Sequence, residues 1–396
     1  MFTPTRAAAL EALDRFIPSA GITYARRRNF DLRPDGSGGV SQLSPYIRHR
    51  LISEEEVLQA TLSQHSPRDA EKFIQEVFWR SYWKGWLEMR PQAWMQYKQA
   101  VQAGLNRLQS EAGLRQAFDS ACRGETDIEC FNFWSQNLVK NGYIHNHARM
   151  WFASIWIFTL RLPWALGADF FLRHLLDGDP ASNTLGWKWV AGLQTEGKTY
   201  LARASNIAEF TENRFQPEDA DLAPYAEPPE PFQRFDRQPI LFPDTPRLAE
   251  NAVLLLHEDD LWGGAQLDGL NGLPVAAMIC AQYRSPLTVA ERVKSFTADA
   301  ARNTADVLFG TDAPIFDTVE DVATWAKQSG AHNVVTAYAP TGPVSEALSQ
   351  LEPMLKSNDI RLTRVARDYD KMCWPHATKG FFPFKKNIPE FINKIR

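Results

Sequence analysis

The chain has 396 residues, of which 44% are hydrophobic, and a formal net charge of -4. This composition is typical of a water-soluble protein that is long enough for two hydrophobic cores. No apolar run reaches about 18 residues, and the charged first 16 residues lack the apolar segment of a secretory signal, so we expect neither a transmembrane helix nor export. The four cysteines show no C-x-x-C spacing, which argues against a disulfide framework and fits a cytoplasmic protein.

The first 215 residues predict an all-α domain, because apolar residues recur there at helical spacing. Serine-proline pairs at Ser44 and Ser66 predict helix starts with serine as the N-cap, and Ser53 to Glu56 forms a capping box. The segment Tyr24–Phe30 is basic and is expected to be irregular, and a loop is expected at Arg33–Gly39. The predicted helices cover residues 4–20, 70–94, 101–118, 131–141, 148–162 and 168–176.

Residues 216–250 are rich in proline and acidic residues and show no periodicity. They predict an extended linker between two domains.

Residues 251–396 predict an α/β domain, because short apolar runs alternate with helical patterns. Such a sheet is parallel and binds ligands at the carboxyl edge of its strands, where His257–Asp260 would lie. The stretch contains no G-x-G-x-x-G motif and no P-loop, so a nucleotide phosphate site is not predicted there. The predicted strands cover residues 252–256, 273–280, 333–338 and 360–366, and the predicted helices cover 289–308, 319–330 and 344–357.

The stretch Asp177–Trp189 concentrates chemically active side chains, with two carboxylates, an amide and two indoles in thirteen residues. Its glycine and proline predict a tight turn at the start. Because unpaired carboxylates are costly to bury, Asp177 and Asp179 are expected to hold something polar beside a wall of aromatic rings.

Four motifs in the first 215 residues resemble the FAD-binding domain of DNA photolyases and cryptochromes. They are Gly39–Tyr46, Glu76–Arg80, Gly142–Met150 and Asp177–Trp189, and they occur in the order and at the spacing of that family.

Two motifs in the second half resemble the antenna domain of the same family, namely Val253–Leu261 and Thr378–Phe384. In the family this α/β domain precedes the helical one, whereas here it follows. The resemblance therefore implies a circularly permuted chain with a helical domain at 1–215, the linker at 216–250 as the new join, and an antenna-like domain at 251–396. The antenna chromophore stays unknown.

The resemblance implies FAD as the cofactor and assigns its contacts. Hydroxyl and backbone groups would hold the diphosphate together with Arg80, although Val40 stands where a threonine is common. Arg149 and Asp177 would form an ion pair against the flavin, and Asn183 would face its N5 atom. The implied FAD-binding residues are Tyr24, Val40, Ser41, Gln42, Leu43, Ser44, Phe73, Glu76, Arg80, Asn146, Arg149, Asp177, Asp179 and Asn183.

The resemblance also implies light-driven splitting of cyclobutane pyrimidine dimers, with a lesion pocket formed by Glu76, Trp79, Asn146, Met150 and Trp189. UV-damaged DNA would be the partner of a monomeric protein, and Arg26, Arg27, Arg28, Arg48 and Arg50 are candidate phosphate contacts. Trp187 and Trp164 match the first two members of the electron-transfer chain of the family. Leu108 stands at the third position, where Trp134, Trp151 or Trp156 could substitute.

Three alternatives to dimer repair stay open. One is a cryptochrome-type photoreceptor, and another is repair of (6-4) photoproducts, although Met150 stands where the (6-4) enzymes place a second histidine. The third is a flavoprotein that has lost its light chemistry and whose α/β domain binds a partner.

Overall fold

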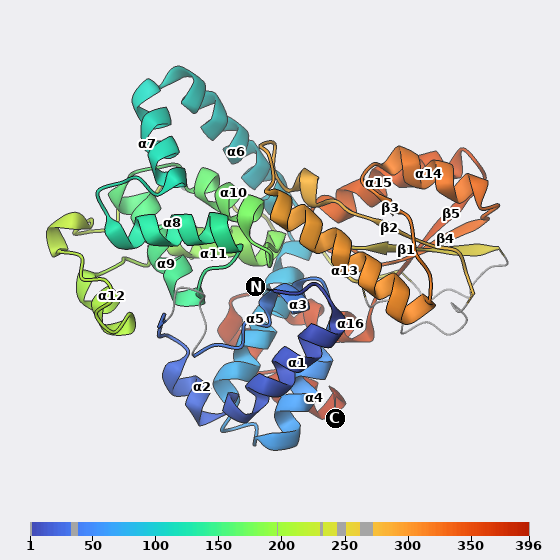
Figure 1. The fold of residues 1–396 in the computed structure, drawn as a ribbon, viewed down its shortest axis with the longest axis horizontal. Helices are drawn as coiled ribbons and strands as arrows, with labels where there is room; N and C mark the ends of the chain where they lie inside the picture. The colour runs from blue at the N-terminus through green and yellow to red at the C-terminus, as the bar shows by residue number, and fades with distance from the viewer. Residues whose placement is uncertain are drawn as a thin grey trace.

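The computed structural model describes residues 2–32, 39–195, 197–229, 233–243, 251–261 and 272–395. Helices dominate the first part, and strands alternate with helices in the second (Figure 1). The α-helices of the first part are α1 (Arg6–Phe16), α2 (Ile22–Arg27), α3 (Ser44–Arg48), α4 (Glu54–Gln64), α5 (Glu71–Glu88), α6 (Gln92–Ser110), α7 (Ala112–Arg123), α8 (Glu129–Asn141), α9 (Asn146–Ser154), α10 (Trp164–His174), α11 (Pro180–Val190) and α12 (Ala204–Phe210).

The second part is built on a parallel sheet with the strand order β3-β2-β1-β4-β5. Its central strand β1 pairs Leu254 with Val275 on one side and with Val335 on the other. The predicted fold class, an all-α domain followed by a parallel α/β sheet, is therefore confirmed. The elements are β1 (Ala252–His257), β2 (Val275–Met278), α13 (Glu291–Phe309), β3 (Ile315–Phe316), α14 (Val319–Gln328), β4 (Asn333–Ala337), α15 (Pro343–Lys356), β5 (Arg361–Val365), α16 (Asp368–Cys373), α17 (Phe381–Lys385) and α18 (Ile388–Ile395).

Both faces of the sheet are buried, because successive side chains of a strand point to opposite faces. Val253 and Leu255 of β1 belong to a hydrophobic cluster with α14 and α15. Leu254 and Leu256 belong to a second cluster that contains α13 and helices of the first part. Continuous apolar runs such as 252–256 were therefore a sound signal for central strands, whereas the two residues of β3 were too few to give one.

Three local predictions in the helical part were wrong. The first four residues of the segment expected to be irregular, 24–27, lie in α2, which has six residues and is too short to show a period. Ser44 was expected to be the N-cap with Pro45 as the first helical residue. In the structure Ser44 and Pro45 are the first and second residues of α3, so the N-cap is Leu43. Ser66 does not open a helix. Its hydroxyl accepts from the amide of Asp69 in an isolated turn, and α5 begins at Glu71.

Other helix boundaries follow from local chemistry. The capping box predicted at Ser53 is present, with Ser53 and Glu56 each accepting from the other's backbone amide. The helix predicted over 101–118 is broken at Glu111, whose backbone is extended between α6 and α7. The loop predicted at Arg33–Gly39 lies outside the described residues except for Gly39, and the linker is described only at 216–229 and 233–243.

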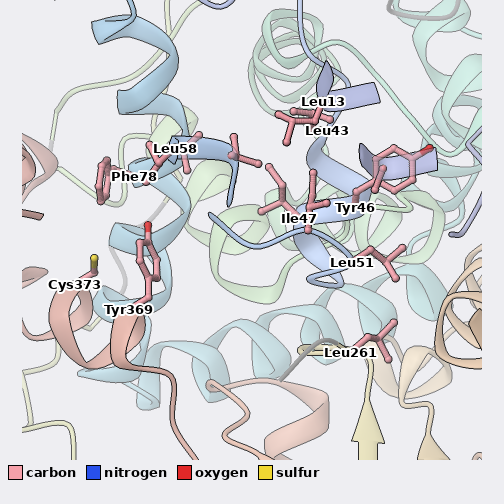
Figure 2. Packing of buried hydrophobic residues seen from close by; sticks show 14 of the residues in the cluster. Leu13, Leu43, Tyr46, Ile47, Leu51, Leu58, Phe78, Leu261, Tyr369 and Cys373 are labelled. Atoms are coloured by element: carbon pink, nitrogen blue, oxygen red, sulfur yellow. The ribbon is translucent and has the colours of Figure 1, made fainter. Parts of the chain in front are cut away.

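One hydrophobic cluster contains residues from both ends of the chain. Figure 2 shows Phe78 of α5 beside Tyr369 of α16, and Leu51 near Leu261, which follows β1. Helices α17 and α18 pack against α5 and α4 (Figure 1). The proposed division into domains stays a prediction, but this cluster links the two predicted domains through a shared apolar contact.

Candidate functional site

A cavity of about 590 Å³ opens in the helical part between α2, α3, α5, α9 and α11. Its volume lies in the range of small-molecule and cofactor sites. Its lining includes nearly all the residues that the sequence assigned to cofactor or lesion, namely Tyr24, Val40, Ser41, Gln42, Ser44, Phe73, Glu76, Trp79, Arg80, Asn146, Arg149, Met150, Asp177, Asp179, Asn183, Trp187 and Trp189.

The turn before α11 presents two buried carboxylates to this cavity. Asp177 accepts from Nη2 of Arg149 at 2.8 Å, which is the ion pair that the sequence predicted. Burial raises the pKa of Asp177, but the charge and hydrogen bond of Arg149, together with Ser44 and Arg80, outweigh burial and hold the pKa below its usual range. The carboxylate is therefore ionised, and Arg149 compensates its charge.

Asp179 has a structural task in addition to lining the cavity. It is the N-cap of α11, where it accepts from the amide of Ser182 at 2.8 Å, and Pro180 stands at the first helical position. Its second oxygen lies 3.4 Å from Nζ of Lys84. The resemblance implies that Asp179 also accepts from a polar edge of flavin or adenosine. The ligand would then bind an oxygen that already contacts Ser182 or Lys84.

Two features of the cavity wall fit a large polar ligand. Nη1 of Arg80 and Nε1 of Trp187 are buried donors without a hydrogen-bond partner among the described residues, although both side chains line the cavity. A buried donor without a partner is costly, so a bound acceptor would stabilise the site. Gly186 leaves open space at the wall, because a Cβ atom placed on it would meet no atom within 4 Å beyond the adjacent backbone of its own helix.

Asn183 is oriented by its own hydrogen bond. Its Nδ2 donates to the carbonyl oxygen of Ala168 at 2.8 Å. Because a backbone carbonyl can only accept, the remaining side-chain atom of Asn183 is its oxygen, which accepts. The residue therefore brings an acceptor to the cavity wall.

Glu76 and Trp79 have partners that the sequence did not predict. Glu76 accepts from Nη1 of Arg28 at 2.6 Å. Burial raises the pKa of Glu76 despite the charge of Arg28. Trp79 stacks on Phe381 of α17 with ring centroids 3.7 Å apart and planes 11° apart. One face of the predicted dimer cradle is therefore covered by the C-terminal segment.

The two indoles of α11 lie in different surroundings. Trp187 is 3% exposed and packs edge-on against Phe171 and Trp156, with centroids at 5.1 Å and 6.2 Å. Trp189 is 37% exposed and stacks near Tyr200, with centroids at 5.9 Å. Both line the cavity, one from its interior and one from the solvent side.

Two assigned residues lie outside the cavity. Leu43 is fully buried in the hydrophobic core, and Trp164 does not line the cavity. The ring of Trp164 lies 5.9 Å from that of Tyr97, which lies 5.1 Å from that of Trp94. Aromatic side chains therefore extend from Trp164 to Tyr97 and Trp94 of α6. The sequence match had placed the third member of the electron-transfer chain at Leu108, which is not aromatic.

Two candidate DNA contacts are corrected by the structure. Arg48 and Arg50 are 1% and 3% exposed, and they form ion pairs with acids of the α/β part. They are therefore unavailable to a phosphate backbone. Arg26 and Arg27 are exposed, and Arg28 is half-buried at the cavity.

Other cavity residues were not assigned to the cofactor or lesion from the sequence. Trp83 lies one turn after Trp79 on α5, with ring centroids 5.2 Å apart. The guanidinium carbon of Arg149 lies over the ring of Tyr143, 5.5 Å from the ring centroid. Helical spacing from Trp79 could have indicated Trp83, whereas Phe381 gave no signal because it is remote in the sequence.

Two buried histidines predict a loss of stability in mild acid. Burial, helped by nearby cationic groups, lowers the pKa of both His49 and His145 to about 3. Below the ordinary histidine pKa of about 6.5, the unfolded chain binds protons that the folded chain does not, so stability falls as the pH falls from about 6.5 toward about 3.

At pH 5 each of these histidines should reduce the free energy of unfolding by about 2 kcal/mol relative to pH 7. Urea unfolding at both pH values measures this difference. A His145→Asn variant keeps an acceptor for the amide of His147, which His145 now caps, and the difference should shrink by about 2 kcal/mol. An unchanged difference in this variant would contradict the assignment.

Residues 73–220 match the family described as the FAD binding domain of DNA photolyase. The deoxyribodipyrimidine photo-lyase of Agrobacterium fabrum is 32% identical over 208 residues, which are 51% of this chain and 41% of the relative. That of Streptomyces griseus is 30% identical over 218 residues, which are 52% and 45%.

The chain spans less than half the length of these relatives. A solved structure of a bacterial class III photolyase from Agrobacterium tumefaciens is 29% identical, with a TM-score of 0.45 over 54% of this chain and 44% of that one. In the part of the chain that the structure describes, no helix is long and apolar enough to cross a membrane.

The helical fold, the cavity and the match over residues 73–220 define an FAD-binding flavoprotein. FAD is its cofactor, and its unpartnered donors and open wall fit that ligand. Within the helical part, residues 73–220 match the FAD-binding domain of DNA photolyase, and about half of the chain is similar to deoxyribodipyrimidine photo-lyases.

Proposed function

We propose that this protein is a light-driven lyase that splits cyclobutane pyrimidine dimers in UV-damaged DNA. The observation that supports this most is that Glu76, Asn146, Met150 and the two aromatic residues Trp79 and Trp189 line the same cavity as the proposed flavin contacts. When bound, reduced FAD supplies the light-driven electron for such a reaction. The residues of the chain bind and orient the two ligands.

Within this proposal the cavity has two regions. Arg80, Arg149 and Asp177 would hold the polar groups of FAD, and Asn183 would accept from the flavin edge. A flipped lesion needs apolar surface for its rings and polar groups for its carbonyls. Trp189 offers exposed aromatic surface, and Met150, which lines the same cavity, would pack adaptably against the lesion.

Glu76 would hold a proton at the lesion carbonyl. Burial raises its pKa, which increases the protonated fraction available to donate. Arg28 would balance the carboxylate charge when the proton leaves, because it lies 2.6 Å away. The raised pKa of Glu76 and its contact with Arg28 distinguish it from a carboxyl group that only stabilises the fold.

The test is illumination of the purified, reduced protein with dimer-containing single-stranded and duplex DNA. Loss of dimers in blue light but not in the dark supports the proposal. If bound FAD is reduced normally by light and no dimers are lost, the lyase function is wrong.

Replacing Glu76 by Ala should lower the repair rate by about 100-fold while FAD stays bound, because the proposed proton donor is lost. Dimer loss per absorbed photon measures the effect. The matched control is Glu71→Ala on the same helix, whose partner Lys385 is partly exposed, and this variant should repair normally. Equal rates in the two variants would contradict the role of Glu76.

A photoreceptor without repair activity is the second candidate, and one contact favours it. Phe381 covers a face of Trp79, the residue assigned to the dimer cradle. A cradle closed in this way leaves less surface for a lesion. A Phe381→Ala variant that gains DNA affinity or repair would show that this contact restricts the pocket.

We also propose that the α/β part corresponds to the antenna domain of the family, placed after the helical domain instead of before it. Its parallel sheet and the position of His257–Asp260 at the carboxyl end of β1 support this. A crystal structure of the FAD-bound protein whose α/β part failed to superpose on that domain would contradict the permutation.

A further inference from the structure

The carboxyl edge of β1 ends in a run of buried acids that contacts the helical part. Glu258 and Asp259 are 1% and 3% exposed. Glu258 accepts from Nη2 of Arg284 at 2.8 Å and from the amide of Cys280 at 2.8 Å. Asp259 lies 2.5 Å from Nη1 of Arg48. Side chains of the protein itself therefore occupy this part of the edge, where the sequence indicated a ligand.

The two arginines that pair with these acids, Arg48 and Arg284, also contact the turn that carries Asp177. Nε of Arg48 donates to the carbonyl oxygen of Gly178 at 2.9 Å. Nη1 of Arg284 lies 3.5 Å from the carbonyl oxygen of Leu175. The backbone on both sides of Asp177 is thus bonded to cations that the α/β acids anchor.

His49 makes a third link between the same two segments. Its Nδ1 lies 2.9 Å from the carbonyl oxygen of Glu258, and its Nε2 lies 3.2 Å from that of Leu176. Because the buried ring is neutral, it donates from one nitrogen at a time, so it adds one hydrogen bond to the link.

We propose that Glu258 and Asp259 are positioning residues for the FAD site, acting through Arg284, Arg48 and the turn at residues 175–178. The α/β part then has a direct task in flavin binding whether or not it holds an antenna chromophore. The physical reason is that a displaced turn would move Asp177 away from Arg149 and away from the cavity wall. This inference rests on the proposed flavin contact of Asp177.

The neighbouring acid Asp260 is a matched control. It is equally buried and lies next in the sequence, but its partners are Arg50 and Arg367. Among the described residues, neither of these arginines forms a hydrogen bond with the turn at residues 175–178. A carboxylate lost here should destabilise the fold without changing the flavin site.

The experiment uses the full chain and compares Glu258→Gln, Asp259→Asn and Asp260→Asn. We measure the dissociation constant for FAD, the vibronic structure of the bound flavin absorption band, and thermal unfolding. The first two variants should bind FAD about tenfold more weakly and alter the absorption band. Asp260→Asn should lower the melting temperature by a similar amount and keep the wild-type affinity and band.

Arg48→Lys provides a variant that retains the charge. It keeps a cation beside Asp259 but removes the Nε donor to Gly178, so it should show the same loss of FAD affinity with less loss of stability. Wild-type FAD binding in Arg48→Lys and Asp259→Asn, or an equal loss in Asp260→Asn, would overturn the inference. If the wild-type chain itself fails to bind FAD, the flavin assignment of the site is wrong as well.

Discussion

Replacing Asp177 by Asn should weaken FAD binding by about 100-fold and yield protein that loses its flavin during purification. The carboxylate is 6% exposed and is the ion-pair partner of Arg149 at 2.8 Å. The variant keeps the shape of the side chain but leaves a largely buried guanidinium without a counter-charge. Flavin absorbance per protein and titration of the stripped protein with FAD measure the result.

The same change should lower the free energy of unfolding by about 2 kcal/mol, less than for a fully buried pair because the side chain of Arg149 is 24% exposed. The matched control is Asp169→Asn in α10. Asp169 is 1% exposed and pairs with Arg173 at 2.9 Å, but it does not line the cavity. It should destabilise the fold and leave FAD affinity unchanged. If both variants retain FAD equally well, the cofactor role of Asp177 is wrong.

Local chemistry explains which parts of the fold could be predicted. Continuous apolar runs identified the central strands, and the capping box at Ser53 identified the start of α4, because each signal is complete within a few residues. The turn before α11 was predicted for the same reason. The fold class needed only the order of these elements.

The role of buried charge could not be predicted in this way. Arg48 and Arg50 looked like surface cations, but their partners Glu258, Asp260 and Asp370 lie more than 200 residues away in the sequence. Burial of a charge depends on such distant partners, and no local pattern reports them. The stacking of Phe381 on Trp79 could not be predicted for the same reason, because the two aromatic residues are far apart in the sequence.

The candidate cofactor site was accessible from the sequence because its assigned residues, apart from Tyr24 and Phe73, occur in four short motifs, three of which lie on or beside α5, α9 and α11. The structure brings these motifs to one cavity. The exception within the set is Leu43, which is the N-cap of α3 and is fully buried in the hydrophobic core.

The largest separation of effects is expected between the two indoles of α11. Trp187→Phe should slow light-driven reduction of bound FAD by about 100-fold, because a buried oxidisable ring at the cavity wall is lost. Repair by protein that has been reduced chemically beforehand should stay near the wild-type rate. Phenylalanine keeps most of the packing against Phe171, so the fold should be preserved.

Trp189→Ala should have the opposite pattern. Its ring is 37% exposed at the mouth of the cavity and packs on one side near Tyr200, so its removal takes away aromatic surface for the lesion, worth about 1–3 kcal/mol per stacked base. Affinity for dimer-containing DNA should fall by about tenfold or more, and light-driven FAD reduction should be unchanged. Because the residues are two positions apart on one helix, each variant controls for general damage to α11 in the other. A parallel loss of both activities in both variants would show that the indoles serve the packing of the helix and have no separate roles.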